Sequence, residues 1–433
     1  MKQILSNLCL IFLAITCPLS IYSQDKLTTK YYSNGNIKAI GVEIEGMREG
    51  EWKYYFFNDT ISDLKLKKIL KIGKYKNDNQ IANWKTYDIK GILIEILNYK
   101  KNSTKGSMSY NHKTFYPSGA LKEDYEVLNN HKTGNYTSYY SDKTIKEKGY
   151  YKDNNKTGEW QSYNPNNKGR SITYFHQGKK HGKHLSFKSE KDTVTHGSYN
   201  LGKKIGIWTH FKNGKINTSI EYLTSKNYIH KSYYENGKLD LVLNYSDGRQ
   251  QGEQLRYHDN GQLQTVSYYN NGKASNKWKV FNRTGVLILE RLFDDNGKLT
   301  DENTFFIDGT IKTIKNDFLY EERFQNGVIK KKCKYNNENK HCKEYFDNQT
   351  IKKEEKYVGD KLILLTKYYS NGKIKAKCKD NSNGSTVCEI YYRSGKIERI
   401  ESRKNGNAKP NGIWSYYKEN GELLKEVNFD KPK

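Results

Sequence analysis

The chain has 433 residues, of which only 35% are apolar, and its formal net charge is +27. That length would usually mean two or three globular domains, but so polar a chain cannot easily fill several compact cores. Its 37 tyrosines can instead cover thin sheets, and 34 glycines against five prolines indicate many tight turns. The composition therefore argues against a multidomain globular protein.

The positive charge does not identify a partner by itself. It could attract an anionic partner such as nucleic acid, lipopolysaccharide or an acidic protein, or it could follow from the codon bias of an AT-rich genome. The lysines are spread along the whole chain and interleaved with Glu and Asp, whereas a specific nucleic-acid site should concentrate them. We therefore favour the compositional explanation and expect no specific nucleic-acid binding.

Residues 1–23 have the features of a secretory signal peptide. Lys2 is followed by an apolar run at 8–15 and by small residues up to Ser23. Cleavage after Ser23 would make Gln24 the new N-terminus and leave a net charge of +26, because Lys2 is the only charged residue removed. The apolar run is too short for a stable membrane span, so we expect an exported chain, periplasmic or associated with the outer surface.

Two further features bear on the leader and on the membrane. Cys17 allows a lipid anchor as the alternative, but the preceding Ala14-Ile15-Thr16 lacks the small residue that such a site needs directly before its cysteine. After residue 23 no stretch is apolar enough to cross a membrane. We therefore predict no transmembrane segment once the leader is removed.

Internal repetition dominates the rest of the chain, residues 24–433, which we predict to be a single repeat array. Segments of the form Tyr-Tyr-x-Asn-Gly recur, for example at 31–35, 233–237 and 368–372. Their glycines follow one another at steps of 23 or 24 residues. The equivalent glycines of the best-spaced part are Gly214, Gly237, Gly261, Gly285 and Gly309. At this period the mature chain accommodates about 17 units.

The six tryptophans test the repeat independently. Each is followed three residues later by Tyr or Phe, and four are preceded by Gly at the second position upstream. We take them as the repeat aromatic positions: Trp52, Trp84, Trp160, Trp208, Trp278 and Trp414.

Each unit is predicted to contain two strands. The first strand runs through Trp-x-x-Tyr-Tyr to Asn-Gly, for which we predict a type I′ turn. The second strand carries Ile or Leu followed by Lys, as at Ile37-Lys38 and Ile374-Lys375. No long segment has helical periodicity. The predicted fold is thus all-β, an elongated array of antiparallel β-hairpins that forms one continuous twisted sheet, on the order of 150 Å long if it stays open.

Trp and the aromatic residue three positions later would point to opposite faces of a regular strand. Either both faces are partly covered by aromatic rings, or a β-bulge separates the two residues. Both alternatives remain open from the sequence.

Four cysteines remain after removal of the leader, an even number suited to an oxidising compartment. Cys333 and Cys378 occupy the same position of a second strand, and Cys342 and Cys388 open the first strands that follow. Each pair therefore flanks one loop on neighbouring strands, close enough to bond. We predict the disulfides Cys333–Cys342 and Cys378–Cys388; a zinc site is the rival, disfavoured because the two pairs lie far apart along the array.

The repeats resemble a known family, the MORN-repeat variants of bacteria, many of which are described as YwqK-like antitoxins. The matching segments are 48–52 (Arg-Glu-Gly-Glu-Trp), 156–160 (Lys-Thr-Gly-Glu-Trp) and the Tyr-Tyr-x-Asn-Gly motifs, and the resemblance covers nearly all of residues 28–429. The resemblance implies that the repeats form rods or platforms that hold proteins or lipids together. It indicates the fold better than the function.

Motifs for catalysis or cofactor binding are not found in the sequence. It has no phosphate loop, nucleophile elbow, His-Glu-x-x-His or Cys-x-x-Cys motif, so we predict no enzyme activity and no cofactor. His176, His181 and His184 surround one turn, but no Cys or carboxylate completes a metal site, and we expect solvent-exposed histidines. Asp301 and Glu302 are expected in a loop and not to act as glycosidase acids.

Two function classes remain. The first is a non-catalytic protein-binding or scaffold module at the cell envelope, with another protein as its partner and an anionic envelope lipid or glycan as the alternative ligand. The second is an antitoxin or immunity protein that neutralises a partner toxin, which the family resemblance suggests. A cytosolic toxin would conflict with the leader, whereas a periplasmic toxin would not.

Overall fold

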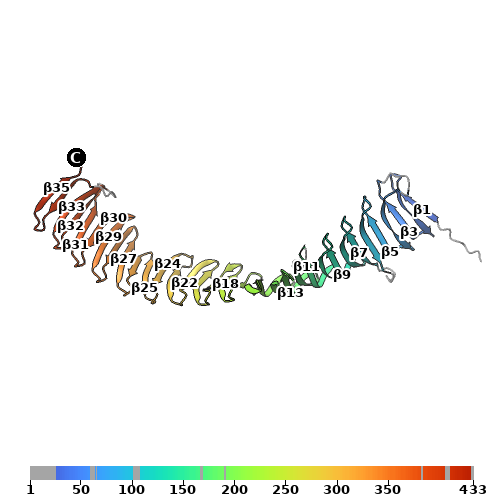
Figure 1. Cartoon of the computed structure of the whole chain (residues 1–433), viewed down its shortest axis with the longest axis horizontal. Helices are drawn as coiled ribbons and strands as arrows, with labels where there is room; N and C mark the ends of the chain where they lie inside the picture. The colour runs from blue at the N-terminus through green and yellow to red at the C-terminus, as the bar shows by residue number, and fades with distance from the viewer. Residues whose placement is uncertain are drawn as a thin grey trace, which may run out of the picture. The chain divides into compact units, whose positions relative to one another are not determined.

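The computed structural model describes residues 26–58, 64, 66–100, 108–165, 169–189, 192–381, 384–404 and 410–430. The predicted leader, residues 1–23, lies outside these described residues. The described part contains strands and turns and no α-helix. Within it, no helix is long and apolar enough to cross a bilayer. Its 35 strands belong to one antiparallel sheet of consecutive hairpins, which confirms the predicted fold class (Figure 1).

Contacts between residues divide the chain into two compact units, Met1–Thr193 with Tyr199–Gly202 and Val194–Ser198 with Lys203–Lys433. The strands of the first unit are β1 (Lys26–Tyr31), β2 (Ile37–Ile44), β3 (Met47–Tyr55), β4 (Ile69–Lys76), β5 (Asn79–Tyr87), β6 (Leu93–Tyr99), β7 (Ser109–Phe115), β8 (Leu121–Leu128), β9 (His131–Tyr139), β10 (Ile145–Lys152), β11 (Asn155–Tyr163), β12 (Arg170–His176) and β13 (Lys179–Phe187). β14 (Thr193–Asn200) has residues in both units.

The second unit continues the same alternation of first and second strands. Its strands are β15 (Lys203–Lys212), β16 (Lys215–Tyr222), β17 (Tyr228–Tyr233), β18 (Leu239–Ser246), β19 (Arg249–Gln250), β20 (Gly252–Tyr257), β21 (Leu263–Asn270), β22 (Lys273–Phe281), β23 (Leu287–Phe293), β24 (Leu299–Phe305), β25 (Ile311–Asn316), β26 (Leu319–Arg323), β27 (Ile329–Asn336), β28 (Asn339–Tyr345), β29 (Ile351–Val358), β30 (Lys361–Tyr368), β31 (Ile374–Asp380), β32 (Ser385–Tyr391), β33 (Ile397–Lys404), β34 (Ile413–Tyr417) and β35 (Leu423–Asn428).

The turn after Tyr-Tyr-x-Asn-Gly differs from the predicted type I′ turn. Between Tyr32 and Asn36 only Gly35 has a positive φ, of 82°. The Gly35 N–H donates to the Tyr32 carbonyl at 3.0 Å, and the Tyr32 N–H donates to the Asn36 carbonyl at 2.8 Å. This is a three-residue loop, a type I turn followed by a glycine in the left-handed region. The prediction was wrong at these motifs because Asn-Gly ends a longer loop there, but it holds at Asn213-Gly214, where both residues have positive φ and Lys212 pairs with Lys215.

Type I′ geometry also occurs at connections between a second strand and the next first strand. Asn77 and Asp78 have φ values of 48° and 62°, and Asp153 and Asn154 have values of 48° and 63°. Positive φ at both central residues defines this turn and matches the twist of the strands it joins. In hairpins such as those of β2 with β3 and of β10 with β11, the two ends therefore use different turns.

In six repeats a tyrosine directly before the loop forms a hydrogen bond to the following repeat. The Tyr32 hydroxyl donates to the carbonyl of Tyr55, 23 residues later, at 2.9 Å. The same bond recurs from Tyr116 to Tyr139, Tyr140 to Tyr163, Tyr234 to Tyr257, Tyr369 to Tyr391 and Tyr392 to Tyr417. This accounts for the second Tyr of the Tyr-Tyr motif, which supplies a donor to a carbonyl at the end of the following first strand.

The tryptophans lie over residues of the preceding second strand, and five of these six residues are small. Four of them cover glycines eleven positions earlier: Trp52 on Gly41, Trp84 on Gly73, Trp160 on Gly149 and Trp208 on Gly197. A Cβ added to any of these glycines would lie 2.2–2.3 Å from the indole ring. The indole N–H donates to the carbonyl after the glycine, as from Trp52 to Val42 at 3.1 Å. We call the position on the second strand that the indole covers, occupied here by glycine, the slot.

The residue in the slot determines how deeply the indole is buried. The four tryptophans that lie on glycine are no more than 2% exposed. Trp278 lies opposite Ser267, and Trp414 lies opposite Glu401; both rings stay half-buried. The indole N–H bond is kept in both cases, to Tyr268 at 3.0 Å and to Ser402 at 2.9 Å. Glycine therefore permits the full flat contact because it has no side chain.

A bulge in the first strand carries the indole over the slot. In the hairpin of β2 and β3, Ile40 pairs with Lys53 and Val42 pairs with Glu49, so that Gly41 stands opposite three residues. The first of the three has positive φ in all six tryptophan repeats. These residues are Gly50, Ala82, Gly158, Gly206, Asn276 and Gly412, with φ between 53° and 68°. The Gly noticed two residues before Trp thus provides a conformation that Ala82 and Asn276 also adopt.

The aromatic residue three positions after Trp faces the other side of the sheet where contacts define it. Phe211 packs against His196 with ring centroids 5.4 Å apart, and His196 precedes the slot glycine Gly197. Neighbouring strand residues alternate between faces, so Phe211 lies opposite Trp208. Of the two alternatives left by the sequence, aromatic cover on both faces holds in this repeat, and the register also shifts between Trp208 and Phe211.

We predict that Gly149→Ala loosens the hairpin of β10 and β11, because the new methyl group would displace the Trp160 ring. The expected cost is about 1–3 kcal/mol, as for other overpacked sites. Hydrogen exchange of residues 145–163 measures it locally, which suits a repeat array that need not unfold in one step. Ser267→Ala is the matched control: it leaves a Cβ where one already exists, and it should change exchange in β21 and β22 little. Equal protection in wild type and Gly149→Ala would contradict the role of the slot.

Candidate interaction surface

The six predicted repeat tryptophans form the internal cover of the sheet. In the first unit Trp52, Tyr75 and Trp84 pack with buried Ala39, with ring centroids of Tyr75 and Trp84 4.8 Å apart. A second cluster of the same unit contains Trp160, Tyr136 and Val127. The rings of the four deepest tryptophans are thus unavailable as a binding surface, and a ligand must contact other side chains.

Cys333 and Cys378 lie in the slot of repeats that have no tryptophan, and Cys342 and Cys388 stand opposite them on the neighbouring first strands. Cys333 pairs with Cys342 and Cys378 with Cys388 in the strand register. Their sulfurs are 2.06 and 2.12 Å apart, and the Cα separations are 3.9 and 4.0 Å. Cys333 stands four residues before the two-residue turn, as Gly73 does before its own turn. In these repeats a disulfide therefore takes the place of the contact between indole and glycine. Their first strands lack the β-bulge that precedes tryptophan.

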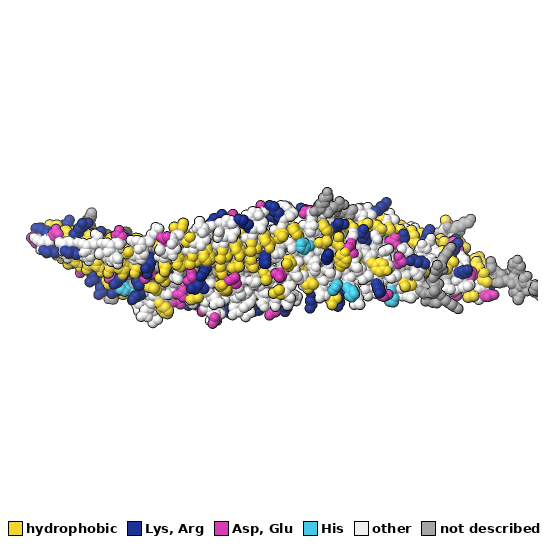
Figure 2. Space-filling model, turned by 90° about the horizontal axis from the view of Figure 1, so that it is seen from below, with side chains coloured by type: hydrophobic (Ala, Val, Ile, Leu, Met, Phe, Trp, Pro, Cys, Tyr) yellow, Lys and Arg dark blue, Asp and Glu magenta, His cyan; other side chains and the backbone are white. Residues whose placement is uncertain are grey.

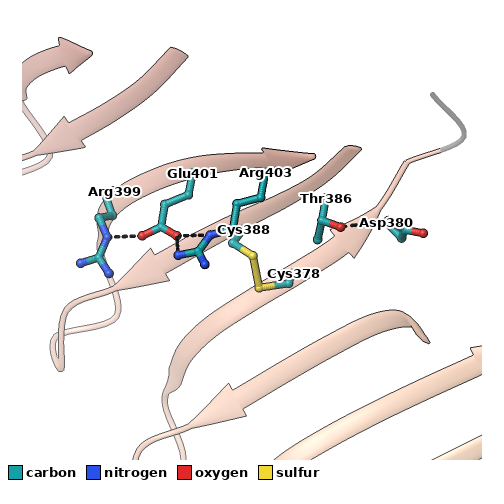
Figure 3. The surroundings of a disulfide bond; sticks show 7 residues. All are labelled: Cys378, Asp380, Thr386, Cys388, Arg399, Glu401 and Arg403. Carbon is teal, nitrogen blue, oxygen red and sulfur yellow. Dashed lines mark hydrogen bonds and ion pairs between the residues drawn. A yellow bond between two sulfur atoms is a disulfide. The ribbon is translucent and has the colours of Figure 1, made fainter. Parts of the chain in front are cut away.

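The second cystine borders a charged cluster (Figure 3). Cys388 pairs with Glu401 on β33, and Glu401 is only 3% exposed. Arg399 donates to Glu401 at 2.5 Å and Arg403 donates to it at 2.8 Å. Burial alone would raise the pKa of Glu401, but the two guanidinium groups outweigh it and hold the pKa below its usual value.

A similar cluster surrounds Glu321 on β26, which is 3% exposed. Arg323 and Lys332 donate to its two carboxylate oxygens at 2.5 and 2.9 Å. Burial raises the pKa of Glu321, but the hydrogen bonds from the two cations lower it by more. The pKa therefore lies below its usual value. Both buried glutamates are therefore neutralised by neighbouring cations and serve as structural anions.

The histidines near residue 180 do not assemble a metal site. The rings of His176 and His181 are 5.7 Å apart, whereas His184 contacts Thr173 through Nδ1 at 2.8 Å. In the described ranges, no group of three His, Cys, Asp or Glu side chains could hold a metal ion. His184 instead occupies the first-strand position that Trp has in other repeats, because its partner Thr173 lies in the slot.

Asp301 and Glu302 lie on strand β24, so the predicted loop position was wrong. Glu302 accepts a hydrogen bond from Arg291 at 2.8 Å, and Asp301 accepts one from Asn316 at 3.2 Å. Adjacent strand residues point to opposite faces, so the two carboxylates cannot act on one bond of a substrate. The sequence prediction placed these residues in a loop because it relied on a spacing of 24 residues between turn glycines. The spacing is only 12 residues from Gly285 to Gly297, so a strand lies where a loop was predicted.

A row of aromatic–aliphatic pairs runs along each unit at the loop end of the hairpins. The last aromatic of a first strand pairs with the Ile or Leu that begins the second strand, usually where the register shifts. In the second unit these pairs are Phe211/Ile216, Tyr233/Leu239, Tyr257/Leu263, Phe281/Leu287, Phe293/Leu299, Phe305/Ile311, Tyr345/Ile351, Tyr368/Ile374, Tyr391/Ile397 and Tyr417/Leu423. We call this set the apolar row.

Most members of the apolar row are half-buried, and several are more exposed, such as Leu299 at 37% and Ile311 at 38%. Hydrophobic side chains also gather in a band, bordered by polar and charged ones, on the face that Figure 2 shows. Contiguous apolar surface of this kind is uncommon on proteins without partners. The apolar row is therefore the candidate surface for contacts with another molecule.

The Lys that follows Ile or Leu in the second strand has a structural explanation. Its ammonium group lies over the ring of the loop aromatic, as for Lys38 over Tyr32 at 5.7 Å and Lys375 over Tyr369 at 5.6 Å. The same contact recurs for Lys122/Tyr116, Lys146/Tyr140, Lys312/Phe306, Lys330/Phe324 and Lys352/Phe346. Such cation–π contacts are modest but repeated, so part of the lysine content serves the fold.

A family model of the MORN repeat variant matches five segments, residues 132–153, 156–177, 229–247, 250–273 and 410–431. The chain carries MORN-variant repeats. Four of the five matches begin with a first strand, and all except 156–177 span a three-residue loop and the strand after it. The resemblance stated from the motifs is thereby confirmed at the level of the repeat, while the YwqK-like assignment stays a prediction. Among curated proteins the search finds no match.

Solved structures add no argument to the MORN-variant assignment. A crystal structure described as TcdB2-TccC3-TEV has 8% sequence identity and a TM-score of 0.13, with 94% of this chain and 24% of that chain covered. A putative 6-phosphogluconolactonase from Bacteroides fragilis has 12% identity and a TM-score of 0.11, with 95% of this chain and all of that chain covered. The chain thus spans about a quarter of the length of the first of these.

We predict that non-reducing peptide mapping of the protein finds Cys333 linked to Cys342 and Cys378 linked to Cys388. Each cystine closes a short loop, so its removal by paired Cys→Ser substitution should cost about 2–3 kcal/mol locally. Hydrogen exchange of β27, β28, β31 and β32 measures that loss. A peptide that joins Cys333 to Cys378 or Cys388, or four free thiols, would contradict the slot pairing.

For the buried anion, we predict that Glu401→Gln destabilises β33 and β34 by about 1–3 kcal/mol at neutral pH, because it removes charged hydrogen bonds. The folded-state pKa of Glu401 is lowered, so its stabilising contribution is present above the unfolded value and is lost as pH falls through the folded value. The difference between wild type and Glu401→Gln in hydrogen exchange should therefore shrink in acid. The control is Glu426→Gln, which replaces an exposed carboxylate on β35. A difference between wild type and Glu401→Gln that does not depend on pH would contradict the explanation.

Proposed function

We propose that this chain is an exported, non-catalytic repeat protein that serves as a protein-binding or scaffold module at the cell envelope. The observation that supports it best is the apolar row, which repeats in nearly every hairpin and stays partly exposed. A surface that recurs from repeat to repeat suits a long contact with a partner better than it suits the chemistry of a small substrate.

Export is supported by two independent features. The leader at residues 1–23 has the charge, apolar run and small residues of a signal peptide. The four remaining cysteines stand in two pairs at disulfide distance, and such bonds persist in oxidising compartments. Export also agrees with a partner at the envelope, either a structural protein or, in the alternative function, a toxin that acts outside the cytosol.

We predict that the mature protein begins at Gln24 and is recovered in the periplasm or at the cell surface. N-terminal sequencing of the fractionated protein measures this directly. A deletion of residues 2–23 is the control and should leave the protein in the cytosol with reduced cysteines. Recovery of full-length protein with Met1 in the soluble cytosolic fraction would overturn the proposed export.

The binding role can be tested on the apolar row by cross-linking in the envelope fraction, with partners identified by mass spectrometry. Leu299→Ser with Ile311→Ser should abolish one specific cross-linked partner, because both side chains belong to the row. Ile207→Ser with Ile413→Ser is the matched control, since these residues are 58% and 52% exposed but lie outside the row. Loss of the partner in both variants, or in neither, would count against the row as the contact surface. A toxin as the captured partner would favour the antitoxin role.

A further inference from the structure

Three lysines of consecutive second strands stand in one line across the second unit. Lys334, Lys356 and Lys379 lie on β27, β29 and β31, and the register connects them through His341 and Leu364 on the strands between. Since strands are about 4.8 Å apart, the lysines follow one another at about 10 Å. We call these three residues the lysine row.

The lysine row faces away from the cystines. Lys334 follows Cys333 and Lys379 follows Cys378, and neighbouring strand residues alternate between faces. Each of these two strands is thus fixed to its neighbour by a disulfide directly behind the row. A row held in this way loses little backbone freedom when a ligand binds, which favours affinity.

The charges of the lysine row are not neutralised by the protein. All three side chains are exposed, and within the described residues none of them makes an ion pair. The neighbouring cations differ in this respect. Lys332 contacts Glu321 at 2.9 Å, and His341 contacts Glu354 at 2.6 Å. The row therefore presents three free positive charges on one line.

The same face carries part of the apolar row. By alternation from Cys342, Tyr345 points to the side of His341, and Tyr368 reaches Glu354 on that side at 3.3 Å. Both tyrosines are half-buried and present ring faces and edges beside the lysines. A ligand that lies along the row would meet cations at a regular interval and aromatic rings next to them.

We propose that this face binds a linear acidic polysaccharide, which lies across β27–β31 with its carboxylates on the lysine row and its sugar rings toward the tyrosines. A polymer with regularly repeated charges can meet regularly spaced cations one after another. A folded acidic protein has no reason to repeat its charges at this spacing, whereas a linear polyanion repeats them along its whole length. The inference extends the envelope role proposed above from a protein partner to a glycan.

The test uses the purified mature chain with its disulfides formed, so its outcome does not depend on export. Binding of polygalacturonate, a linear uronic-acid polymer, is measured by calorimetry at several salt concentrations. We expect binding that weakens as salt rises, and no binding of neutral dextran. The triple variant Lys334→Gln, Lys356→Gln, Lys379→Gln should bind about tenfold more weakly, as expected for three exposed charge contacts.

The matched control is Lys152→Gln, Lys183→Gln, Lys203→Gln, which removes the same charge from exposed lysines elsewhere. It should keep wild-type affinity, and hydrogen exchange confirms that both triple variants are folded. Equal losses in both variants would mean that only net charge matters and would overturn the proposal, as would an unchanged triple variant. Tighter, row-dependent binding of phosphatidylglycerol vesicles, polyglutamate or single-stranded DNA would replace the glycan by that class.

Discussion

A sheet in a single layer has no second layer to cover it, and this structure meets that constraint by laying an indole flat on a glycine. Trp160 can cover the backbone of Gly149 because no side chain intervenes, and its N–H satisfies the next carbonyl at 3.2 Å. The cover and the covered strand belong to the same hairpin. The hydrophobic contact that a globular domain makes between layers is therefore made here within each repeat.

In repeats without a tryptophan, other side chains take the place of the contact between the indole and the slot. Cys333 and Cys342 replace it by a covalent bond, Gln254 by hydrogen bonds to Asn244, and His184 by a contact with Thr173. The described residues between Trp278 and Trp414 hold both cystines and both buried glutamates, so this stretch relies on covalent and ionic contacts. The same stretch carries the lysine row, so the three lysines lie in the part of the second unit that holds both disulfides.

Much of the fold could be predicted because the repeat period, the turn residues and the cysteine positions all reflect local pairing between neighbouring strands. The slot could not be foreseen, although one signal was present: Gly41, Gly73, Gly149 and Gly197 each precede a Trp by eleven residues. The turn type was misjudged because Asn-Gly fits two loop lengths. The lysine row was hidden in a uniformly lysine-rich sequence, since only the register separates paired from unpaired lysines.

The cystines also bear on how the sheet carries mechanical load. Backbone hydrogen bonds of a sheet point along the direction in which strands are stacked, so tension in that direction acts on every ladder in turn. Most ladders here are joined only by hydrogen bonds, the Tyr32–Tyr55 type of bond among them. The hairpins of β27 with β28 and of β31 with β32 are closed by sulfur–sulfur bonds as well. Under stretching these two hairpins would be the last to open, whereas the ladders between β28 and β31 would yield as the others do.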